Sequence, residues 1–281
     1  MKHLSDGYRL SNGMQIPCIG FGTWLTPDGE VAVQAVSEAL KAGYRHIDTA
    51  AFYGNEVSIG KAIRESGIPR EEIFVTSKLW NTERGYEKTM AAFETTLQNL
   101  GLEYLDLYLI HWPAAANQYE NWDEINLSTW KAMTELYKAG KIKTIGVSNF
   151  KPHHLASLMK TEVPPMVNQI EYQPGFTQNE TVEYCKKNNV LIEAWSPLGR
   201  GKVLANDTLV TIAANYQKTV AQLCIRWCLQ NGTLPLPKSV TPSRILANAD
   251  VFDFAITAED MATINALVIE GEHHDSDQVD F

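Results

Sequence analysis

Residues 43–56 read GYRHIDTAAFYGNE, and this stretch gives the first indication of the fold. Asp48 ends a short strand-like run, and Tyr53 follows it in a loop bounded by glycines. Two further strand-like runs end in the same way, one at Lys78 and one at His111. Polar side chains at the carboxyl ends of successive strands are where α/β barrels build their active sites. We therefore expect an α/β protein whose site lies at its strand ends.

The chain alternates between short apolar runs and helical patterns about eight times. The expected strands are Ile19–Thr23, Arg45–Asp48, Ile73–Leu79, Leu105–Trp112, Ile142–Ser148, Met166–Ile170, Val190–Ala194 and Leu234–Pro237. The helical patterns include Glu30–Ala42, Glu87–Leu100, Ser128–Ala139, Glu180–Asn188 and Val220–Gln230. Such alternation predicts βα units around a parallel sheet. Eight units of about 35 residues account for the 281 residues, so we expect one domain, residues 1–281, folded as a (β/α)8 TIM barrel.

Two segments lie outside this alternation. Residues 8–16 read YRLSNGMQI, which predicts a β-hairpin that turns on Asn-Gly and closes the bottom of the barrel. The chain after Leu267 is polar and acidic and contains His273, His274 and Asp275. Because no further metal-ligating residues accompany this group elsewhere, we expect a solvated tail and no metal site.

The composition narrows the classes of partner and compartment. A formal net charge of −9 argues against nucleic acid and anionic membranes. The N-terminus lacks the apolar run of a signal peptide, and no stretch approaches the ~20 apolar residues of a membrane span. The cysteines, Cys18, Cys185, Cys224 and Cys228, form no CxxC pair. We therefore expect a cytoplasmic protein with neither a membrane nor nucleic acid as its partner.

The polar side chains at the strand ends complement one another chemically. Reducing a carbonyl requires a hydride at carbon, which a nicotinamide supplies, and a proton at oxygen. Tyr53 is a candidate for the proton donor, although a free phenol has a pKa of about 10. Lys78 should lower this pKa, and Asp48 can hold the lysine in place. His111 can donate a hydrogen bond that orients the carbonyl. Each side chain taken alone is more often a surface or capping residue, and His111 could be a core histidine. The joint pattern at three strand ends leaves a catalytic and a structural interpretation open.

Three segments, in sequence order, resemble the signatures of the aldo-keto reductase family, and the resemblance covers nearly the whole chain. They are residues 43–60, beginning GYRHIDTA; residues 145–150, IGVSNF; and residues 236–248, beginning LPKS. The chain is most similar to bacterial and yeast members of the 2,5-diketo-D-gluconate reductase and glyoxal reductase type. The resemblance implies that Asp48, Tyr53, Lys78 and His111 form a catalytic tetrad with Tyr53 as the proton donor.

The resemblance also implies a nicotinamide cofactor that lies extended across the barrel mouth. This explains why the Gly-rich dinucleotide motif is missing, with Leu25 at the third glycine position. In the family, equivalent residues hold the carboxamide, stack on the ring and line the pyrophosphate. The full set implied for this chain is Thr23, Trp24, Asp48, Ser148, Asn149, Gln169, Trp195, Ser196, Leu198, Gly199, Lys238, Ser239, Val240, Arg244 and Asn248.

The third signature indicates which nicotinamide cofactor is used. Lys238, Ser239 and Arg244 place two cations and a hydroxyl near a helix start, a grouping that suits a 2′-phosphate. The residues alone are also typical of a solvated helix start, and it is the resemblance that favours NADPH over NADH. Ala247 departs from the family pattern, because many members carry a glutamate there that contacts adenine.

The expected substrate pocket is aromatic. Trp24, Trp80 and Trp112 follow three of the expected strands, and the resemblance places them around the substrate together with His111. It also implies that residues 113–127 and the C-terminal tail set specificity. Both differ from the commoner family versions. The activity implied is NADPH-dependent reduction of small aldehydes, α-dicarbonyls and keto esters by a monomer.

Other functions fit parts of the sequence. Tyr137 and Lys141 have the spacing of a short-chain dehydrogenase pair, but no N-terminal glycine motif accompanies them. Ser148 lies in a sequence that lacks the closing glycine of a hydrolase nucleophile elbow. A barrel that binds the cofactor without catalysis, as a redox sensor or auxiliary protein, is the remaining alternative. The presence of all four tetrad residues argues for the enzyme.

Overall fold

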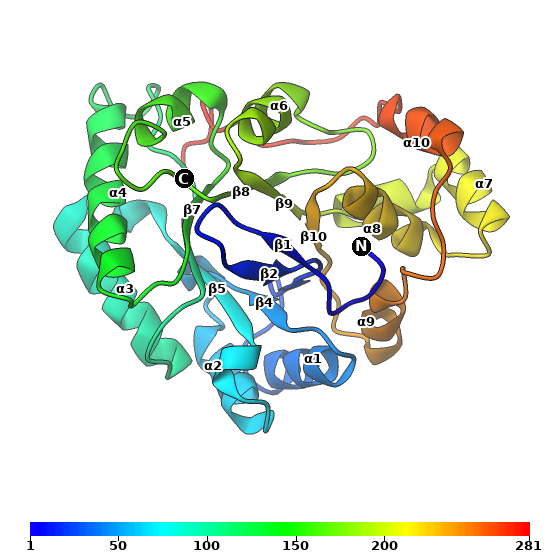
Figure 1. The fold of residues 1–281 in the computed structure, drawn as a ribbon, viewed down its shortest axis with the longest axis horizontal. Helices are drawn as coiled ribbons and strands as arrows, with labels where there is room; N and C mark the ends of the chain where they lie inside the picture. The colour runs from blue at the N-terminus through cyan, green and yellow to red at the C-terminus, as the bar shows by residue number, and fades with distance from the viewer.

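The computed structural model describes residues 1–281, and its main sheet has eight parallel strands arranged as a nearly closed barrel (Figure 1). These strands are β3 (Phe21–Gly22), β4 (His46–Asp48), β5 (Phe74–Leu79), β6 (Leu107–Ile110), β7 (Ile145–Ser148), β8 (Val167–Glu171), β9 (Leu191–Trp195) and β10 (Leu234–Leu236). Backbone hydrogen bonds from Gly20 N to Pro235 O (3.1 Å) and from Gly22 N to Pro237 O (3.0 Å) join the first strand to the last. The predicted barrel is thus confirmed.

Helices surround the barrel (Figure 1). They are α1 (Glu30–Lys41), α2 (Glu56–Glu65), α3 (Tyr86–Leu100), α4 (Trp122–Lys138), α5 (Pro152–Leu158), α6 (Asn179–Lys187), α7 (Asp207–Asn215), α8 (Val220–Gln230), α9 (Pro242–Ala249) and α10 (Ala258–Asn265). Short 3-10 segments are η1 (Ala51–Tyr53), η2 (Arg70–Glu72), η3 (Asn81–Glu83) and η4 (Gly199–Ala205). No helix combines the length and the apolar character that crossing a membrane requires.

The strands are buried on both faces. β5 and β6 are buried along their whole length, because the helices cover their outer faces and side chains fill the interior. The helices also pack closely on one another. At Gly60 in α2, a Cβ atom would lie 1.9 Å from the carbonyl oxygen of Leu100 in α3, so this approach requires glycine.

Two boundaries near the site differ from those expected. α4 begins at Trp122 and not at Ser128, so the loop between β6 and α4 is shorter than predicted. Asp123 and Glu124 lie in its first turn, where acidic side chains interact favourably with the helix dipole. β6 ends at Ile110, which leaves His111 at the start of the following loop.

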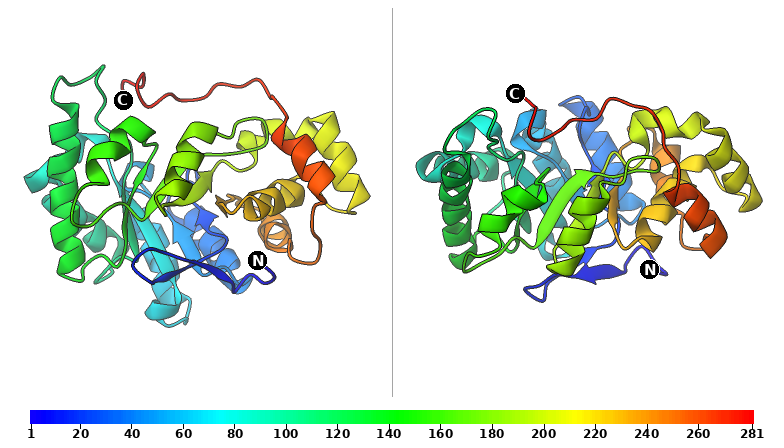
Figure 2. Two further views of the ribbon diagram at one scale, coloured as in Figure 1. Left: turned by 45° about the horizontal axis from the view of Figure 1, so that its top comes forward. Right: turned by 90° about the horizontal axis from the view of Figure 1, so that it is seen from above.

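The two ends of the barrel are covered by different segments (Figure 2). The N-terminal hairpin consists of the antiparallel strands β1 (Gly7–Arg9) and β2 (Gln15–Pro17). Asn12 Nδ2 donates a hydrogen bond to Lys143 O (3.0 Å), and Tyr8 OH donates one to Thr233 O (3.1 Å). Both acceptors lie just before strands, so the hairpin covers the amino ends of the barrel. The C-terminal tail crosses the opposite end, where the carboxyl ends of the strands meet.

Candidate active site

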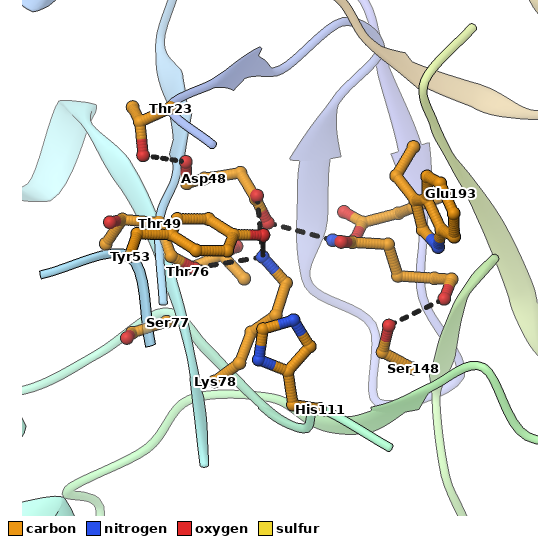
Figure 3. Close-up of polar contacts among 12 residues, drawn as sticks. Thr23, Asp48, Thr49, Tyr53, Thr76, Ser77, Lys78, His111, Ser148 and Glu193 are labelled. Atoms are coloured by element: carbon orange, nitrogen blue, oxygen red, sulfur yellow. Dashed lines mark hydrogen bonds and ion pairs between the residues drawn. The ribbon is translucent and has the colours of Figure 1, made fainter. Parts of the chain in front are cut away.

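The carboxyl ends of β4, β5 and β6 bring Asp48, Tyr53, Lys78 and His111 together (Figure 3). The Lys78 ammonium donates hydrogen bonds to Asp48 Oδ1 (2.7 Å), to the backbone carbonyl of Thr49 (3.0 Å) and to the Tyr53 hydroxyl (3.2 Å). The ring of His111 lies edge-on to that of Tyr53, with 5.7 Å between centroids. The four side chains selected from the sequence therefore form one cluster.

The bonds of Lys78 determine how Tyr53 is used. An ammonium has three N–H groups, and each of those on Lys78 has an acceptor. Because the Tyr53 oxygen accepts one of these bonds, its own proton is free to point into the cavity that Tyr53 lines. The lysine thus leaves the phenol as a hydrogen-bond donor toward any bound molecule.

Burial and charge act against each other on this cluster. Burial raises the pKa of Tyr53, and although the charge of Lys78 works to lower it, Asp48 adds to the rise. Lys78 thus acts on the phenol pKa in the expected direction, but burial outweighs it, because the buried site disfavours the phenolate more than the ammonium stabilises it. For Lys78, burial works to lower the pKa, but Asp48 and Tyr53 together raise it, so the ammonium persists.

His111 is neutral. Burial, followed by the charges of Lys78 and Arg84, holds the pKa of His111 well below its ordinary value. Its Nδ1 atom is buried without a hydrogen-bond partner. A neutral ring that carries its proton on Nε2 leaves only a lone pair at Nδ1 and presents a donor to the cavity.

A second buried carboxyl lies behind Asp48. Gln169 in β8 donates from Nε2 to Asp48 Oδ2 (2.8 Å) and to Glu193 Oε2 (2.8 Å) in β9. Burial, followed by the charge of Asp48, raises the pKa of Glu193 to about 8, so this carboxyl is largely protonated at neutral pH. The sequence reasoning missed Glu193, although an acidic residue within the apolar run 190–195 was a signal that could have found it.

A cavity of about 940 Å³ opens above the cluster at the carboxyl ends of the strands. The predicted cofactor residues on its wall are Trp24, Asp48, Ser148, Asn149, Gln169, Trp195, Ser196, Leu198, Lys238, Ser239, Arg244 and Asn248. The predicted substrate residues Trp24, Trp80, His111 and Trp112 also line it. Thr23, Gly199 and Val240 do not, and Thr23 instead donates its hydroxyl proton to Asp48 O (2.9 Å).

Asn149 links three strand ends at this wall. Its amide nitrogen donates to His111 O (3.0 Å) and Ser148 Oγ (3.0 Å), and its amide oxygen accepts from Trp195 Nε1 (2.8 Å). Asn149 has a left-handed backbone, with φ 63°, and so do the cavity residues Leu25, Ser196 and Arg200. Such conformations are uncommon for residues other than glycine and gather at ligand sites.

The cavity fits a dinucleotide with a nicotinamide ring. Lys238 and Arg244 supply cations near the start of α9, and Arg244 is exposed. The indole of Trp195 provides a flat apolar surface, and beside it Gln169 keeps an amide oxygen that no protein donor occupies. One cavity thus offers cations that can pair with phosphate groups, a flat surface on which a ring can stack and an oxygen that can accept from an amide.

The C-terminal tail packs against the protein, so the expectation of a solvated tail is wrong. The ring of His273 stacks on Phe176, with 3.7 Å between centroids, and its Nδ1 lies 3.2 Å from Glu171 Oε1. The buried hydroxyl of Ser276 donates to Asn149 O (2.5 Å). These contacts come from residues far apart in the sequence, which local patterns do not reveal.

The tail also completes an aromatic wall. The rings of Trp80 and Phe52 stack, with 3.8 Å between centroids. The ring of Phe281 lies nearly parallel to that of Trp80, with 6.1 Å between centroids. The Phe281 ring meets Trp112 edge-on at 5.3 Å, and His274 also lines the cavity. Phe52, His274 and Phe281 were not selected from the sequence.

A cluster around Asp277 fixes the tail to α5. Lys151 Nζ bonds Asp275 and also Asp277 Oδ2 (2.7 Å), while Nε2 of His153 and of His154 lie 2.9 Å and 3.0 Å from Asp277 Oδ1. The imidazoles and carboxylate are close enough to bind a metal. However, His154 Nδ1 accepts from Lys151 N (3.2 Å), so its Nε2 carries a proton and offers no lone pair. The arrangement favours a clamp over a metal site.

Comparisons with known proteins agree with this geometry. The sequence pattern described as the Aldo/keto reductase family matches residues 18–269. The chain is 50% identical over 265 residues to glyoxal reductase of Bacillus subtilis (strain 168), covering 94% of this chain and 93% of that protein. It is 48% identical over 262 residues to 9,11-endoperoxide prostaglandin H2 reductase of Trypanosoma cruzi (strain CL Brener), covering 92% and 90%.

Solved structures share the whole barrel. The aldo-keto reductase MGS-M4, from a Medee basin deep-sea metagenome library, matches with a TM-score of 0.92 and 47% identity, covering 98% of this chain and 100% of that chain. A mutant of Gox0644 in complex with NADPH matches with a TM-score of 0.90 and 42% identity, covering 99% of both chains. Both similarities therefore extend over the barrel and over the residues of the candidate site.

Replacing Glu193 by glutamine should change how stability depends on pH. The folded-state pKa of about 8 exceeds the ordinary value of 4.5, so between these values the folded protein keeps a proton that the unfolded chain releases. The stability that this carboxyl contributes is present below the lower value and is lost as the pH rises through the higher one. Urea unfolding at about pH 5 and about pH 8 should show the wild type losing stability relative to Glu193→Gln. A constant difference between the two proteins would contradict the raised pKa.

Removing the Lys151 side chain should loosen the tail. In Lys151→Ala, two partly exposed ion pairs are lost, and amide hydrogen exchange of residues 273–281 should accelerate roughly three- to tenfold. Lys160→Ala is the matched control, because Lys160 is an exposed lysine just beyond α5 that does not bond the tail. Equal exchange in both variants would show that the clamp does not hold the tail.

Proposed function

Because the chain belongs to the aldo/keto reductase family, we propose that it reduces small carbonyl compounds to alcohols with NADPH as the cofactor. The observation that carries this proposal is the Tyr53 phenol, which accepts a hydrogen bond from a buried ammonium and faces the cavity beside His111. The similarity to a glyoxal reductase and to a structure in complex with NADPH supports it.

The four clustered side chains divide the work of proton delivery. NADPH, when bound, supplies a hydride to the carbonyl carbon. Tyr53 gives its proton to the carbonyl oxygen, and Lys78, 3.2 Å from the phenol oxygen, stabilises the phenolate that remains. Asp48 holds the ammonium, and neutral His111 donates a hydrogen bond to the same carbonyl oxygen. Burial keeps the phenol protonated before the reaction, and the ammonium limits the cost of losing that proton.

The remaining wall residues hold the cofactor. Ser148, Asn149 and Gln169 would hold the carboxamide, and Trp195 would stack on the nicotinamide ring, since all four line the cavity. Ser196 and Leu198 would line the pyrophosphate. Lys238, Ser239, Arg244 and Asn248 would hold the adenosine end, where the cations would select the 2′-phosphate of NADPH. Ala247 also lines this end and offers adenine no carboxylate.

Trp24 and the aromatic wall of Phe52, Trp80, Trp112 and Phe281 select small carbonyl compounds. Small aldehydes, α-dicarbonyls and keto esters present a polar carbonyl to Tyr53 and His111 and a small apolar remainder to the indoles. The protein acts as one domain, residues 1–281, and as a monomer that does not bind nucleic acid. It works in the cytoplasm, which is consistent with four free, buried cysteines.

The first test is NADPH oxidation, followed by absorbance, with methylglyoxal, an aryl aldehyde and a β-keto ester. Tyr53→Phe should lower turnover by at least about 100-fold while leaving the NADPH dissociation constant nearly unchanged, because only the proton donor is lost. Tyr184→Phe, in α6, is the matched control. Substantial turnover by Tyr53→Phe would remove the phenol from this role. NADPH binding without turnover by the wild type would instead favour a non-catalytic barrel.

Arg244→Ala tests the choice of cofactor. Loss of a charge-assisted bond to the 2′-phosphate should raise the KM for NADPH by about tenfold or more and leave the KM for NADH nearly unchanged. Arg9→Ala, in the hairpin at the opposite end of the barrel, is the control for loss of an exposed arginine. Equal effects on both cofactors would argue against a 2′-phosphate site at α9.

A further inference from the structure

The side-chain amide of Gln169 is held from two sides. Its nitrogen carries two N–H groups, one of which bonds Asp48 Oδ2 and the other Glu193 Oε2, both at 2.8 Å. Asp48 in turn pairs with Lys78, so the first anchor belongs to the cluster described above. Glu193 is the second anchor, and it is fully buried behind Gln169.

This arrangement determines which atom of Gln169 faces the cavity. Both N–H groups are used, so the amide oxygen Oε1 is the only polar atom left, and no donor of the protein occupies it. The reversed amide would place a carbonyl oxygen against Asp48 Oδ2, which has no proton to donate because it already belongs to the ion pair with Lys78. Asp48 therefore fixes which way the amide points, and Glu193 accepts the second N–H, which leaves an acceptor at this point of the wall.

We propose that Glu193 is a positioning residue that holds Gln169 with Oε1 toward the cavity, so that this oxygen accepts a hydrogen bond from the NH₂ group of the nicotinamide carboxamide. The inference rests on the cofactor site proposed above and adds a residue that touches no ligand itself. Without Glu193 one N–H of Gln169 would lose its acceptor. The amide would then be free to turn that donor toward the donors of the carboxamide.

The surroundings of Glu193 suit this passive role. His46 Nε2 lies 3.8 Å from Glu193 Oε1 but makes its hydrogen bond to Thr76 Oγ1 at 2.9 Å. Burial, followed by the charge of Lys78, lowers the pKa of His46 to about 3, so His46 does not supply a cation. Glu193 thus acts as a neutral carboxyl whose Oε2 accepts from Gln169. A glutamine at this position would offer the same acceptor.

The test compares binding of NADP⁺ with binding of its 3-acetylpyridine analogue, in which a methyl group replaces the carboxamide NH₂. Dissociation constants come from quenching of tryptophan fluorescence, because Trp24 and Trp195 line the cavity. The wild type should bind NADP⁺ about tenfold more tightly than the analogue, which is the usual effect of losing one hydrogen bond. In Glu193→Met, which keeps the side-chain shape without a carboxyl, the ratio should fall to about threefold or less.

Glu193→Gln separates this role from a general structural one, since it should keep the wild-type ratio. A purely structural effect would weaken both ligands equally in Glu193→Met and leave the ratio unchanged, and that result would overturn the inference. The inference would also be overturned if Glu193→Gln lowered the ratio of the two dissociation constants as much as Glu193→Met does. If Glu193→Met does not fold, Gln169→Asn, which is too short to reach both carboxyls, should lose the ratio in the same way. Failure of the wild type to bind either NADP⁺ or NADPH would instead remove the proposed function itself.

Discussion

The buried ammonium of Lys78 is the interaction on which the rest of the site depends. Its side chain is completely buried, and an unpaired charge in such a position destabilises a protein by about 3–5 kcal/mol. The ammonium is paired with Asp48, the carbonyl of Thr49 and the hydroxyl of Tyr53, which all belong to β4 and the loop after it. These bonds therefore also hold the carboxyl ends of β4 and β5 together and orient the phenol.

Around this ion pair the interior is kept neutral. Burial raises the pKa of Tyr53, raises that of Glu193 to about 8 and, with nearby cations, lowers that of His111. Each of these groups therefore remains uncharged at neutral pH, and the charges of Lys78 and Asp48 face each other without a competing buried charge. An apolar, uncharged environment strengthens the attraction between the two remaining charges.

Much of the fold and part of the site could be predicted because their signals are local. Alternation of apolar runs with helical patterns gave the barrel, and counting from strand ends gave Asp48, Lys78 and His111. Phe281 and Ser276 could not be predicted in the same way, because their roles arise from packing between distant segments. The net direction of the Tyr53 pKa could not be predicted either, since sequence reveals the neighbouring lysine but not the depth of burial. Short helices such as α5 and α9 carry too few turns for a clear periodic pattern.

The bond from Ser276 to Asn149 has a thermodynamic consequence. The backbone of Asn149 accepts from the tail, while its side chain holds the indole of Trp195 and the backbone of His111. Closure of the tail and ordering of this wall are therefore linked equilibria. Linkage is reciprocal, so the ordered wall stabilises the closed tail by the same free energy by which the closed tail stabilises the ordered wall. Through this one residue, the tail over the cavity is coupled to the cavity wall.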